Sequence, residues 1–431
     1  MMNVTIGVPI RNAEKHLPYT LKCFSLLDYP QENFEIIFIN HGSDDSSREM
    51  ITKFSKGRKN VRIIDIPFDG PNRSHVRNQI IKYSDNELII FVDQDVLVLP
   101  DFIEQHVRIH EKYNKCLVTG QIYGKEIPYE SNIMEEYIID IKKNISTLKN
   151  DSIFSDFRVV NNLVSNKDSY TVFDSNMSAW RFFWTTNMSI KKKCLEELPF
   201  EEGFNGWGVE DEEFSYRHCC NDHLLIYSRD ACGIHNPHEI NSEDNNVSWH
   251  NNMSFFLKKY NNREIEFYYM FLIFLDNELK NLDFNLNRIN KNKILNLYKR
   301  SILILKDTLI GENNVAFFLE DFEIANRLQI KNIMNPYLNK RDVPKKNQYV
   351  TMYSTFGINL PYNNNFFDTG LVPFDILQTI SLPFSRLFIL EFMRVVKNPI
   401  FIMDSTSSVQ INQSFRSLLE TFSKEIKFIT V

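Results

Sequence analysis

The stretch LIIFVDQDVLVLP, residues 88–100, decides the fold more clearly than any other part of the sequence. Its five leading apolar residues are typical of a strand buried on both faces, as in parallel α/β sheets. The run then ends in two carboxylates one residue apart, Asp93 and Asp95. Because ligands of such sheets bind at the carboxyl ends of the strands, the stretch predicts both a sheet and a polar site at its edge.

Towards the N-terminus, short apolar runs alternate with helical patterns. The predicted strands are VTIGVPI, FEIIFIN and VRIIDIPF, and the predicted helices contain Leu17, Leu21, Phe24 and Leu27, then MITKF, then HVRNQIIKY. This alternation predicts a doubly wound α/β fold with a Rossmann-like sheet. Polar residues follow these strands too, at Arg11 and Asn12, at Asn40 to Asp45 and at Asp69 to Ser74. The strand ends together predict a cleft.

Composition restricts the class of protein. The chain has 431 residues, of which 43% are hydrophobic, so it is long enough for two or three folded domains. Its net charge is -6, whereas nucleic-acid binders typically have an excess of basic residues, so no nucleic-acid partner is expected. Six cysteines without a CxxC pair favour a reducing cytosol, and the sequence predicts no signal peptide and no transmembrane segment. Membrane contact, if there is any, is expected to be peripheral.

The predicted domains are residues 1–258, which form the α/β domain, a helical segment 259–340, and a small α/β region 341–431. Helical spacing of apolar residues from Met270 to Lys306 and from Ala316 to Met334 is the basis for the middle segment. In the last part, PIFIMD and SFRSLLETFSKEIKFITV predict a strand, a helix and a strand. The polar stretch Asn144 to Tyr170 is expected to be a surface excursion.

Two local patterns carry chemistry. The spacing of Asp93 and Asp95 lets one carboxylate face a ribose and the other a divalent cation, as in Mg²⁺ or Mn²⁺ diphosphate sites; the alternative is a turn with solvated acids. The second pattern is FNGWGVEDEEFSYR, in which Gly206 and Gly208 flank Trp207 and the acids Glu210 and Asp211 start a helix. An ordinary N-terminal charge pattern accounts for the acids, although it leaves the Gly-Trp-Gly sequence unexplained.

Four segments together resemble the family 2 glycosyltransferases of the GT-A fold: VTIGVPIRN, FEIIFINHGSDDSS, SHVRNQII and FVDQDVLVLP. The segment FNGWGVEDEEFSYR further resembles galactosyl- and N-acetylgalactosaminyl-transferases, including bacterial chondroitin-type polymerases, whose motif is Gly/His-Trp-Gly-x-Glu-Asp. The similarity covers roughly residues 3 to 250. It implies a GT-A catalytic domain that binds a nucleotide sugar.

The resemblance also implies roles for individual residues. It places the following in substrate and nucleotide binding: Pro9, Arg11, Asn12, Asn40, His41, Arg77, Asp93, Gln94 and Trp207. Asp211 takes the place of the catalytic base, with Glu210 beside it. Asp95 would bind the metal, with His235 of CGIHNPHE as a further ligand and His238 as the alternative. A carboxylate with an imidazole favours Mn²⁺, with Mg²⁺ as the alternative.

One departure concerns the nucleobase. The family usually carries two aspartates where this sequence has Asn40 and His41, and the second commonly recognises uracil. Either side chain can still hydrogen-bond a base, but the inference of uridine is weaker. Asp44 and Asp45 could compensate, although we expect them to cap the following helix.

Other conspicuous residues have competing interpretations. The cysteines and histidines between His218 and His235 lack the spacing of a zinc site and are expected in the core. Trp180, Trp184 and Trp249 are expected to pack more often than to stack on sugars. The polar segment Asn241 to Asn252 is equally compatible with a lid and with a disordered connector.

The sequence therefore predicts a metal-dependent inverting glycosyltransferase. It would move a hexose or N-acetylhexosamine from a nucleotide donor, with UDP expected, to a glycan, a lipid-linked or a protein acceptor. One rival is a non-catalytic nucleotide- or glycan-binding partner in a glycosylation complex. The other is a sugar nucleotidyltransferase, which needs a glycine-rich basic phosphate loop that VPIRNAEKH does not provide.

Overall fold

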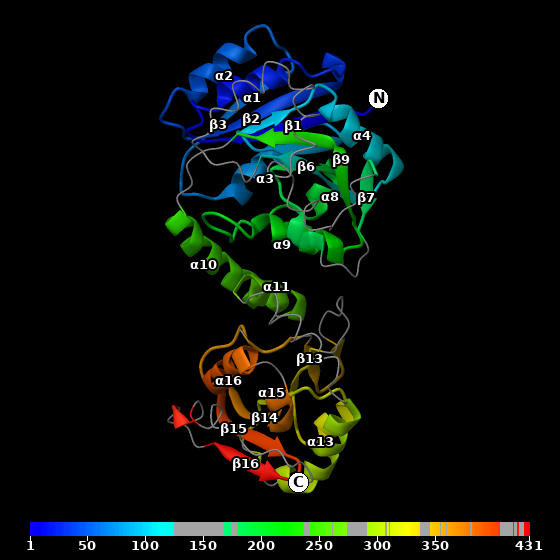
Figure 1. The fold of residues 1–431 in the computed structure, drawn as a ribbon, viewed down its shortest axis with the longest axis vertical. Coiled ribbons are helices and arrows are strands. Elements are labelled where there is room, and N and C mark those ends of the chain that lie inside the picture. The colour runs from blue at the N-terminus through cyan, green and yellow to red at the C-terminus, as the bar shows by residue number, and fades with distance from the viewer. Residues whose placement is uncertain are drawn as a thin grey trace. The chain divides into compact units, whose positions relative to one another are not determined.

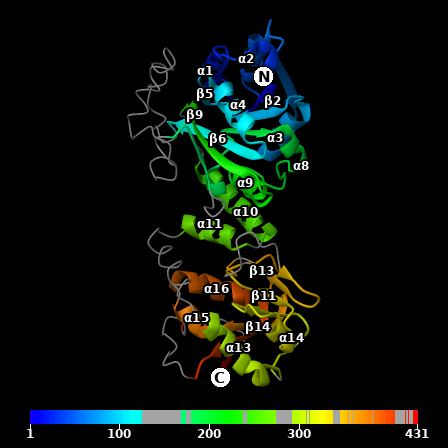
Figure 2. The same cartoon turned by 90° about the vertical axis from the view of Figure 1, so that its right-hand side faces the viewer.

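The computed structural model describes residues 1–124, 168–173, 179–236, 242–260, 262–273, 291–306, 308–309, 311–336, 345–353, 355–358, 360–379, 382–405, 417, 420–421 and 426–431. The chain divides into two compact units, Met1–Asn252 and Met253–Val431. Each unit has its own sheet (Figure 1 and Figure 2). In the part that the structure describes, no helix has the length and apolar character needed to cross a bilayer.

The first unit contains a mixed sheet with helices on both faces. Its elements are β1 (Val4–Ile10), α1 (Leu17–Phe24), β2 (Phe34–His41), α2 (Ser47–Ser55), β3 (Val61–Ile66), α3 (Arg73–Tyr83), β4 (Leu88–Val92), β5 (Val96–Val98), α4 (Phe102–Lys112), β6 (Cys116–Tyr123), β7 (Tyr170–Val172), β8 (Asn187–Lys191), α8 (Lys192–Glu197), α9 (Glu210–Cys220) and β9 (Leu224–His235). Helix α10 (Ser242–Tyr260) spans the division between the units. The strand order is β3-β2-β1-β4-β8-β6-β9-β5, with β7 paired to β9.

The predicted α/β fold is confirmed in this unit. Strands β1, β2, β3 and β4 are parallel neighbours, and every residue of β4 is buried. Helices α1 and α2 cover one face and α3 the other (Figure 1). At Gly7 of β1, a Cβ atom would lie 2.3 Å from Cγ2 of Ile80, so α3 packs directly on the strand backbone. The apolar runs in the sequence therefore correspond to strands buried on both faces.

Antiparallel strands complete the sheet and position the polar strand ends. β8 pairs with β4, and the backbone N–H of Asp93 donates to the carbonyl of Thr186 at 3.3 Å. β5 pairs with β9, with Val96 opposite His235. The residues just before β5 and at the end of β9 are thus held at one place by backbone pairing.

The second unit has a sheet of its own. Its elements are α11 (Arg263–Ile273), α13 (Lys291–Lys306), β10 (Asn314–Phe317), α14 (Phe322–Arg327), β11 (Asn332–Met334), β12 (Lys345–Lys346), β13 (Thr351–Tyr353), β14 (Phe367–Pro373), α15 (Phe374–Thr379), α16 (Leu382–Val395), β15 (Val396–Met403) and β16 (Lys427–Thr430). The order is β12-β13-β11-β10-β14-β15-β16, and the strands from β13 to β16 are parallel. When the antiparallel strand β12 is left out and the parallel strands are numbered from β10, the order is 3-2-1-4-5-6, that of doubly wound nucleotide-binding sheets.

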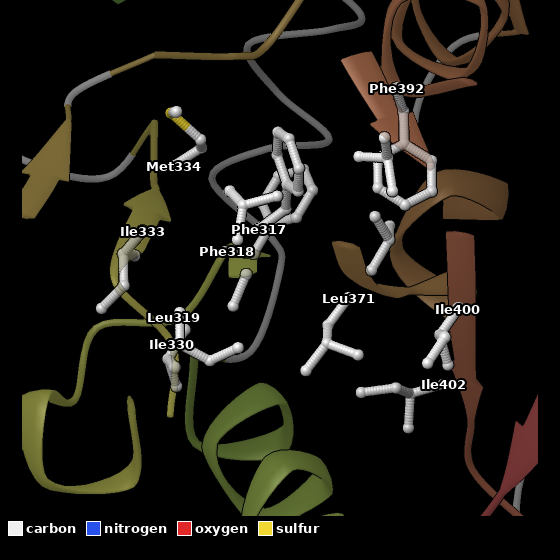
Figure 3. Close-up of a cluster of buried hydrophobic side chains, with 14 of the residues drawn as sticks. Phe317, Phe318, Leu319, Ile330, Ile333, Met334, Leu371, Phe392, Ile400 and Ile402 are labelled. Atoms are coloured by element: carbon white, nitrogen blue, oxygen red, sulfur yellow. The ribbon is translucent and has the colours of Figure 1, made fainter. Parts of the chain in front are cut away.

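A core of aromatic and aliphatic side chains stabilises this second sheet. Phe317 and Leu371 from the central strands lie among the side chains of Phe392, Ile400 and others (Figure 3). The Phe317 ring makes edge contacts with Phe388 and Phe392, at centroid distances of 5.0 and 5.5 Å. The predicted strands at PIFIMD and at the C-terminus are confirmed as β15 and β16.

The predicted helix from Ala316 to Met334 is wrong. The apolar residues at its two ends belong to the parallel strands β10 and β11, and only Phe322–Arg327 is helical. Asp321 begins that helix, since its side chain accepts a hydrogen bond from the Ile324 amide. The spacing of apolar residues in this segment resembles that of a helix, because two short buried strands on either side of a six-residue helix also place apolar residues every three or four positions.

Two other predictions are only partly tested. Between Met270 and Lys306, helices α11 and α13 are present, and residues 274–290 lie outside the described part. The excursion at residues 144–167 and most of the helix before β16 also lie outside it. The boundaries at residues 258 and 340 stay predictions, and the second sheet joins strands from both sides of residue 340.

Candidate active site

A buried ion pair lies at the centre of the candidate site. Arg77 of α3 donates from Nη1 to Oε1 of Glu210, the first residue of α9, at 2.9 Å. Arg77 is 2% exposed and Glu210 3% exposed. The Nη2 atom of Arg77 also lies 3.9 Å from Oδ1 of Asp93, at the end of β4. The guanidinium therefore connects residues that are more than a hundred positions apart.

Asp211 is held next to this pair by Thr185. Its Oδ2 accepts two hydrogen bonds of 3.0 Å, one from the backbone N–H and one from the hydroxyl of Thr185. Thr185 is fully buried, two residues before the start of β8. Since both bonds go to the same oxygen, the carboxylate has a fixed orientation, and its Oδ1 is the oxygen that can receive a proton.

The pKa values of the two adjacent carboxyls, Glu210 and Asp211, are shifted in opposite directions. Burial, together with the charge of Asp211, raises the pKa of Glu210, although Arg77 works against the shift. Burial would also raise the pKa of Asp211, but Arg77 and the Thr185 hydrogen bonds lower it by more. Asp211 is therefore the carboxyl that stays ionised, which is the protonation state that a general base requires.

Replacing Thr185 by Val tests this assignment through pH dependence. The hydroxyl stabilises ionised Asp211, so its loss raises the pKa of Asp211, and the acid limb of kcat/KM moves to higher pH. A hydrogen bond to a charged group is worth about 1.5–3 kcal/mol, so we expect at least about a tenfold loss of kcat/KM on that limb. The measurement is the pH profile of sugar transfer.

Two further variants serve as controls for the Thr185 experiment. Thr185→Ser keeps the hydroxyl and should keep the wild-type profile. Thr186→Val makes the same change at the neighbouring position and should leave the profile unchanged. A Thr185→Val profile identical to the wild type would show that this hydroxyl does not control Asp211.

Asp95 and His235 form a second pair at the edge of the sheet. His235 Nε2 lies 3.5 Å from Oδ2 of Asp95, and the Asn236 amide donates to the carbonyl of Asp95 at 2.8 Å. The pairing of β5 with β9 fixes both residues. A carboxylate oxygen and an imidazole nitrogen suit a borderline divalent cation such as Mn²⁺, so the two residues fit the predicted metal.

The charge of the site also fits a cation. Three carboxylates, Asp93, Glu210 and Asp211, act on the buried guanidinium of Arg77, and Asp95 adds a fourth directly before β5. In the described ranges, no group of three or more His, Cys, Asp or Glu side chains is assembled as a metal cage. A cation bound by Asp95 and His235 would therefore need further ligands besides these two side chains.

A second cluster surrounds Arg11, directly after β1. Its Nη1 donates to the carbonyls of His41 and Gly42, both at 2.9 Å, and its guanidinium carbon lies 3.4 Å from the centroid of the Phe68 ring. Gln94 exchanges two hydrogen bonds with the Arg11 backbone, at 2.9 and 3.2 Å. Hydrogen bonds thus connect the ends of β1, β2 and β4, as expected from the polar residues that follow these strands in the sequence.

His41 belongs to the same cluster. Its ring centroid lies 5.0 Å from that of Phe68, and its Nε2 lies 3.5 Å from Oδ1 of Asp69. Burial lowers the pKa of His41, although Asp69 opposes the shift. Phe68 is 43% exposed. Phe68 was not among the predicted site residues, and only its place as the last residue of the predicted strand VRIIDIPF could have indicated it.

Asn12 and Asn40 hold loops together. Asn12 has a left-handed backbone, with φ of 48°, and its side chain accepts from the Asp44 amide at 3.1 Å. Asn40 donates to Asp65 at 2.8 Å and accepts from the Ser43 amide at 3.3 Å. Of the two predicted capping residues, Asp45 accepts from the amide of Ser47, the first residue of α2, at 2.9 Å, while Ser46 occupies the N-cap position itself.

Trp207 lies on a turn with unusual backbone angles. Gly206, Gly208 and Val209 have φ of 80°, 91° and 76°. Val209 is a β-branched residue in the left-handed region, which costs of order 1–3 kcal/mol. The Trp207 side chain is 42% exposed, and within the described part it makes no hydrogen bond or ring contact. The turn thus presents a large aromatic face directly before Glu210 and Asp211.

Several alternative interpretations can now be placed. Trp180 is 1% exposed and packs at 5.4 Å on Tyr216, so it belongs to the core. The imidazoles of His218 and His223 lie edge to face, 4.6 Å apart, in a packing contact. His238 lies outside the described residues. From Ser242 onwards, the polar segment before Asn252 is helical, so a disordered connector is excluded for that part.

Pro9 lies on β1 opposite Ile39 of β2, next to the cluster around Arg11. The structure therefore places the predicted residues in three groups. Arg77, Asp93, Glu210 and Asp211 form one, Arg11, Gln94 and His41 another, and Asp95 with His235 the third. Within the described residues, side-chain hydrogen bonds connect none of these groups to Asn12, Asn40 or Trp207.

The chain carries a domain of a known family. Residues 5–161 match the family model described as "Glycosyl transferase family 2". The region includes Arg11, Asp93 and Asp95 at the strand ends, and Arg77 on α3. The predicted family is therefore confirmed for this part of the chain, whereas the likeness of the Gly-Trp-Gly segment to galactosyl- and N-acetylgalactosaminyl-transferases stays a prediction.

Relatives and solved structures of the same kind were found. "Validoxylamine A glucosyltransferase" of Streptomyces hygroscopicus subsp. limoneus is 25% identical over 267 residues, which are 60% of this chain and 56% of that protein. "Chondroitin synthase" of Pasteurella multocida is 23% identical over 228 residues, 50% of this chain and 23% of that protein. The chain thus spans about half the length of the first relative and about a quarter of the length of the second.

Among solved structures, S. aureus TarS 1-349 in complex with UDP-GlcNAc has a TM-score of 0.44 at 15% identity. That alignment covers 59% of this chain and 65% of the TarS chain.

Proposed function

We propose that the protein is an inverting glycosyltransferase that moves a hexose or N-acetylhexosamine from a nucleotide donor, with UDP expected, to an acceptor hydroxyl. The observation that carries the proposal is the position of Asp211. It is an ionised carboxylate that Thr185 orients next to the buried guanidinium of Arg77, and Arg77 belongs to the part of the chain that matches family 2. A glycan, a lipid-linked sugar and a protein side chain all remain candidate acceptors.

The residues divide the chemistry between them. Oδ1 of Asp211 takes the proton of the acceptor hydroxyl while the oxygen of that hydroxyl forms a bond to the anomeric carbon. The bond from that carbon to the diphosphate oxygen breaks, and the electron pair leaves with the nucleoside diphosphate. Because one displacement occurs opposite the leaving group, the anomeric configuration inverts. No covalent sugar intermediate is needed.

The donor is held by the strand ends. Asp93 is assigned to the ribose, and Arg11, His41 and Gln94 surround the place where β1 and β2 end. Arg77 places positive charge near Asp93 and the catalytic pair. A divalent cation bound by Asp95 and His235 would neutralise charge on the departing diphosphate. Because phosphate oxygens complete such sites, the cation is expected to bind together with the donor.

Removing the metal should abolish activity. We expect EDTA to reduce the transfer rate at least about 100-fold, because charge neutralisation by a bound cation is worth several kcal/mol. Mn²⁺ should restore the rate, and Asp95→Asn and His235→Gln should each weaken Mn²⁺ binding measured by electron paramagnetic resonance. Asp85→Asn, the same change at an exposed site of the same unit, is the control.

Unchanged activity in EDTA, with wild-type Mn²⁺ binding in both variants, would exclude this metal site.

The stereochemical test uses slow donor hydrolysis, with water as the acceptor. Proton NMR of the first-formed sugar should show the anomer opposite to that of the donor. A product that retains the donor's configuration would contradict the single displacement assigned to Asp211. The Asp211→Asn protein should show no enzymatic hydrolysis above the background.

A further inference from the structure

The turn that carries Trp207 is clamped by the side chain of Asn252. Asn252 belongs to α10, is 4% exposed, and lies 42 or more positions further along the chain than any residue of the turn from Asn205 to Glu210. Its Oδ1 accepts from the backbone N–H of Asn205 at 3.1 Å, and its Nδ2 donates to the carbonyl of Gly208 at 2.8 Å. One carboxamide thus bonds both sides of Trp207.

The same helix fills the space beside both glycines of the turn. A Cβ atom at Gly206 would lie 2.3 Å from Oγ of Ser248, and one at Gly208 would lie 3.0 Å from Cδ1 of Trp249. Both glycines have positive φ. The glycines are therefore required for two reasons, since the backbone angles favour glycine and the helix leaves no room for a side chain.

The other side of the turn is attached to α3. The Gly206 amide donates to the carbonyl of Pro71 at 2.6 Å, and Gly206 forms a parallel bridge with Asn72, the N-cap residue of α3. Helix α3 carries Arg77. The turn is thus held between the helix that supplies the guanidinium and the helix that supplies Asn252.

We propose that Asn252 is a positioning residue for sugar binding and transfer. By holding the strained turn from Gly206 to Val209, it fixes the exposed face of Trp207 and the start of α9, where Glu210 and Asp211 lie. An exposed indole face of this kind suits the apolar C–H face of a sugar ring. This inference rests on the proposed function, because it gives Trp207 a sugar to contact. It also assigns α10 as the support of the sugar site.

The test compares Asn252→Asp with Asn251→Asp. The first change keeps the acceptor for the Asn205 amide but removes the donor to Gly208 and places a carboxylate oxygen against its carbonyl. Asn251 is the exposed neighbour on the same helix, so its variant carries the same added charge. We expect kcat/KM to fall about 10- to 100-fold in Asn252→Asp, mainly through kcat, since small displacements of reacting groups cost that much. The nucleotide affinity should change by no more than about twofold, which is less than the roughly fivefold effect of a single kcal/mol. The reason is that the residues assigned to the nucleotide lie at the strand ends and not on the turn.

A second readout needs no turnover. All four tryptophans lie at or before residue 249 of the first unit, and the difference between each protein and its Trp207→Phe derivative isolates the emission of Trp207. In Asn252→Asp, the anisotropy of that emission should fall, and acrylamide should quench it more strongly. Asn251→Asp should show neither change. If the wild type transfers no sugar, the proposed function fails, but this readout still decides the role of Asn252.

Gly206→Ala provides an independent variant. Its methyl group would meet Ser248 Oγ, so the turn must move away from α10 while Asn252 stays intact. We expect the same loss in kcat and the same change in Trp207 emission. If Asn252→Asp does not fold, this variant alone decides. The inference is overturned if the folded variants match Asn251→Asp both in kcat/KM and in Trp207 emission.

Discussion

Replacing Asp211 by Asn should reduce the rate of sugar transfer by about 10²–10⁴-fold, the usual contribution of a general base. The amide has nearly the same shape, and its oxygen can still accept the two hydrogen bonds from Thr185. It cannot take a proton from an acceptor hydroxyl. The variant should therefore fold normally and bind nucleotide as the wild type does, with the loss in kcat.

The matched control is Asp222→Asn, at an exposed position two residues after the end of α9. Asp222 has φ of 61°, a conformation that Asn tolerates well, so this change should not disturb the fold. Initial rates with saturating donor and Mn²⁺ compare the two variants. Transfer by Asp211→Asn at more than about a third of the rate of the control would mean that another group acts as the base.

Replacing Arg77 by Met should destabilise the first unit by about 3–5 kcal/mol, the cost of leaving a buried charge without its partner. Glu210 would lose its 2.9 Å hydrogen bond, and Asp93 and Asp211 would lose the nearest buried cation. The measurement is urea unfolding followed by tryptophan fluorescence. Because all four tryptophans lie in the first unit, the signal reports on that unit alone.

The Arg77→Met, Glu210→Gln double variant should recover part of the loss, since it removes the uncompensated charge of Glu210. The pH dependence provides a second check. Arg77 opposes the rise in the pKa of Glu210 and lowers the pKa of Asp211, so without it both pKa values rise. Carboxyls with raised pKa values destabilise the folded state as pH increases, so the single variant should approach the wild-type stability as pH falls.

If the single variant instead lost stability relative to the wild type on acidification, the pair would not have the electrostatic role assigned to it.

The first half of the sheet could be predicted because its signals are local. Each run such as VTIGVPI or LIIFV is continuous and buried, and each strand ends in the polar residues that the sequence shows there. The association of Asp93 with Arg77 follows from this topology, since parallel strands and the helices between them bring these ends together. Glu210 was placed at a helix start, and α9 begins at that residue.

The parts that depend on distant pairing could not be predicted. Thr185 reaches Asp211 because β8 runs antiparallel to β4, and nothing near Thr185 in the sequence indicates that partner. Asn252 lies in a polar segment without a distinctive pattern, and its bonds to Asn205 and Gly208 arise only when α10 packs on the turn.

Two strands of the second sheet, β10 and β11, escaped prediction for a different reason. They have four and three residues, too short to be distinguished from a helix by spacing alone.

The most direct measurement is the release of nucleoside diphosphate by the full chain from a panel of nucleotide sugars, with Mn²⁺ and without it. The account predicts release from one donor, with a UDP-sugar expected, and loss of that release in EDTA and in the Asp211→Asn protein. If the folded wild-type protein released no nucleotide from any donor and bound none of them, the account of this site as a glycosyltransferase centre would be contradicted.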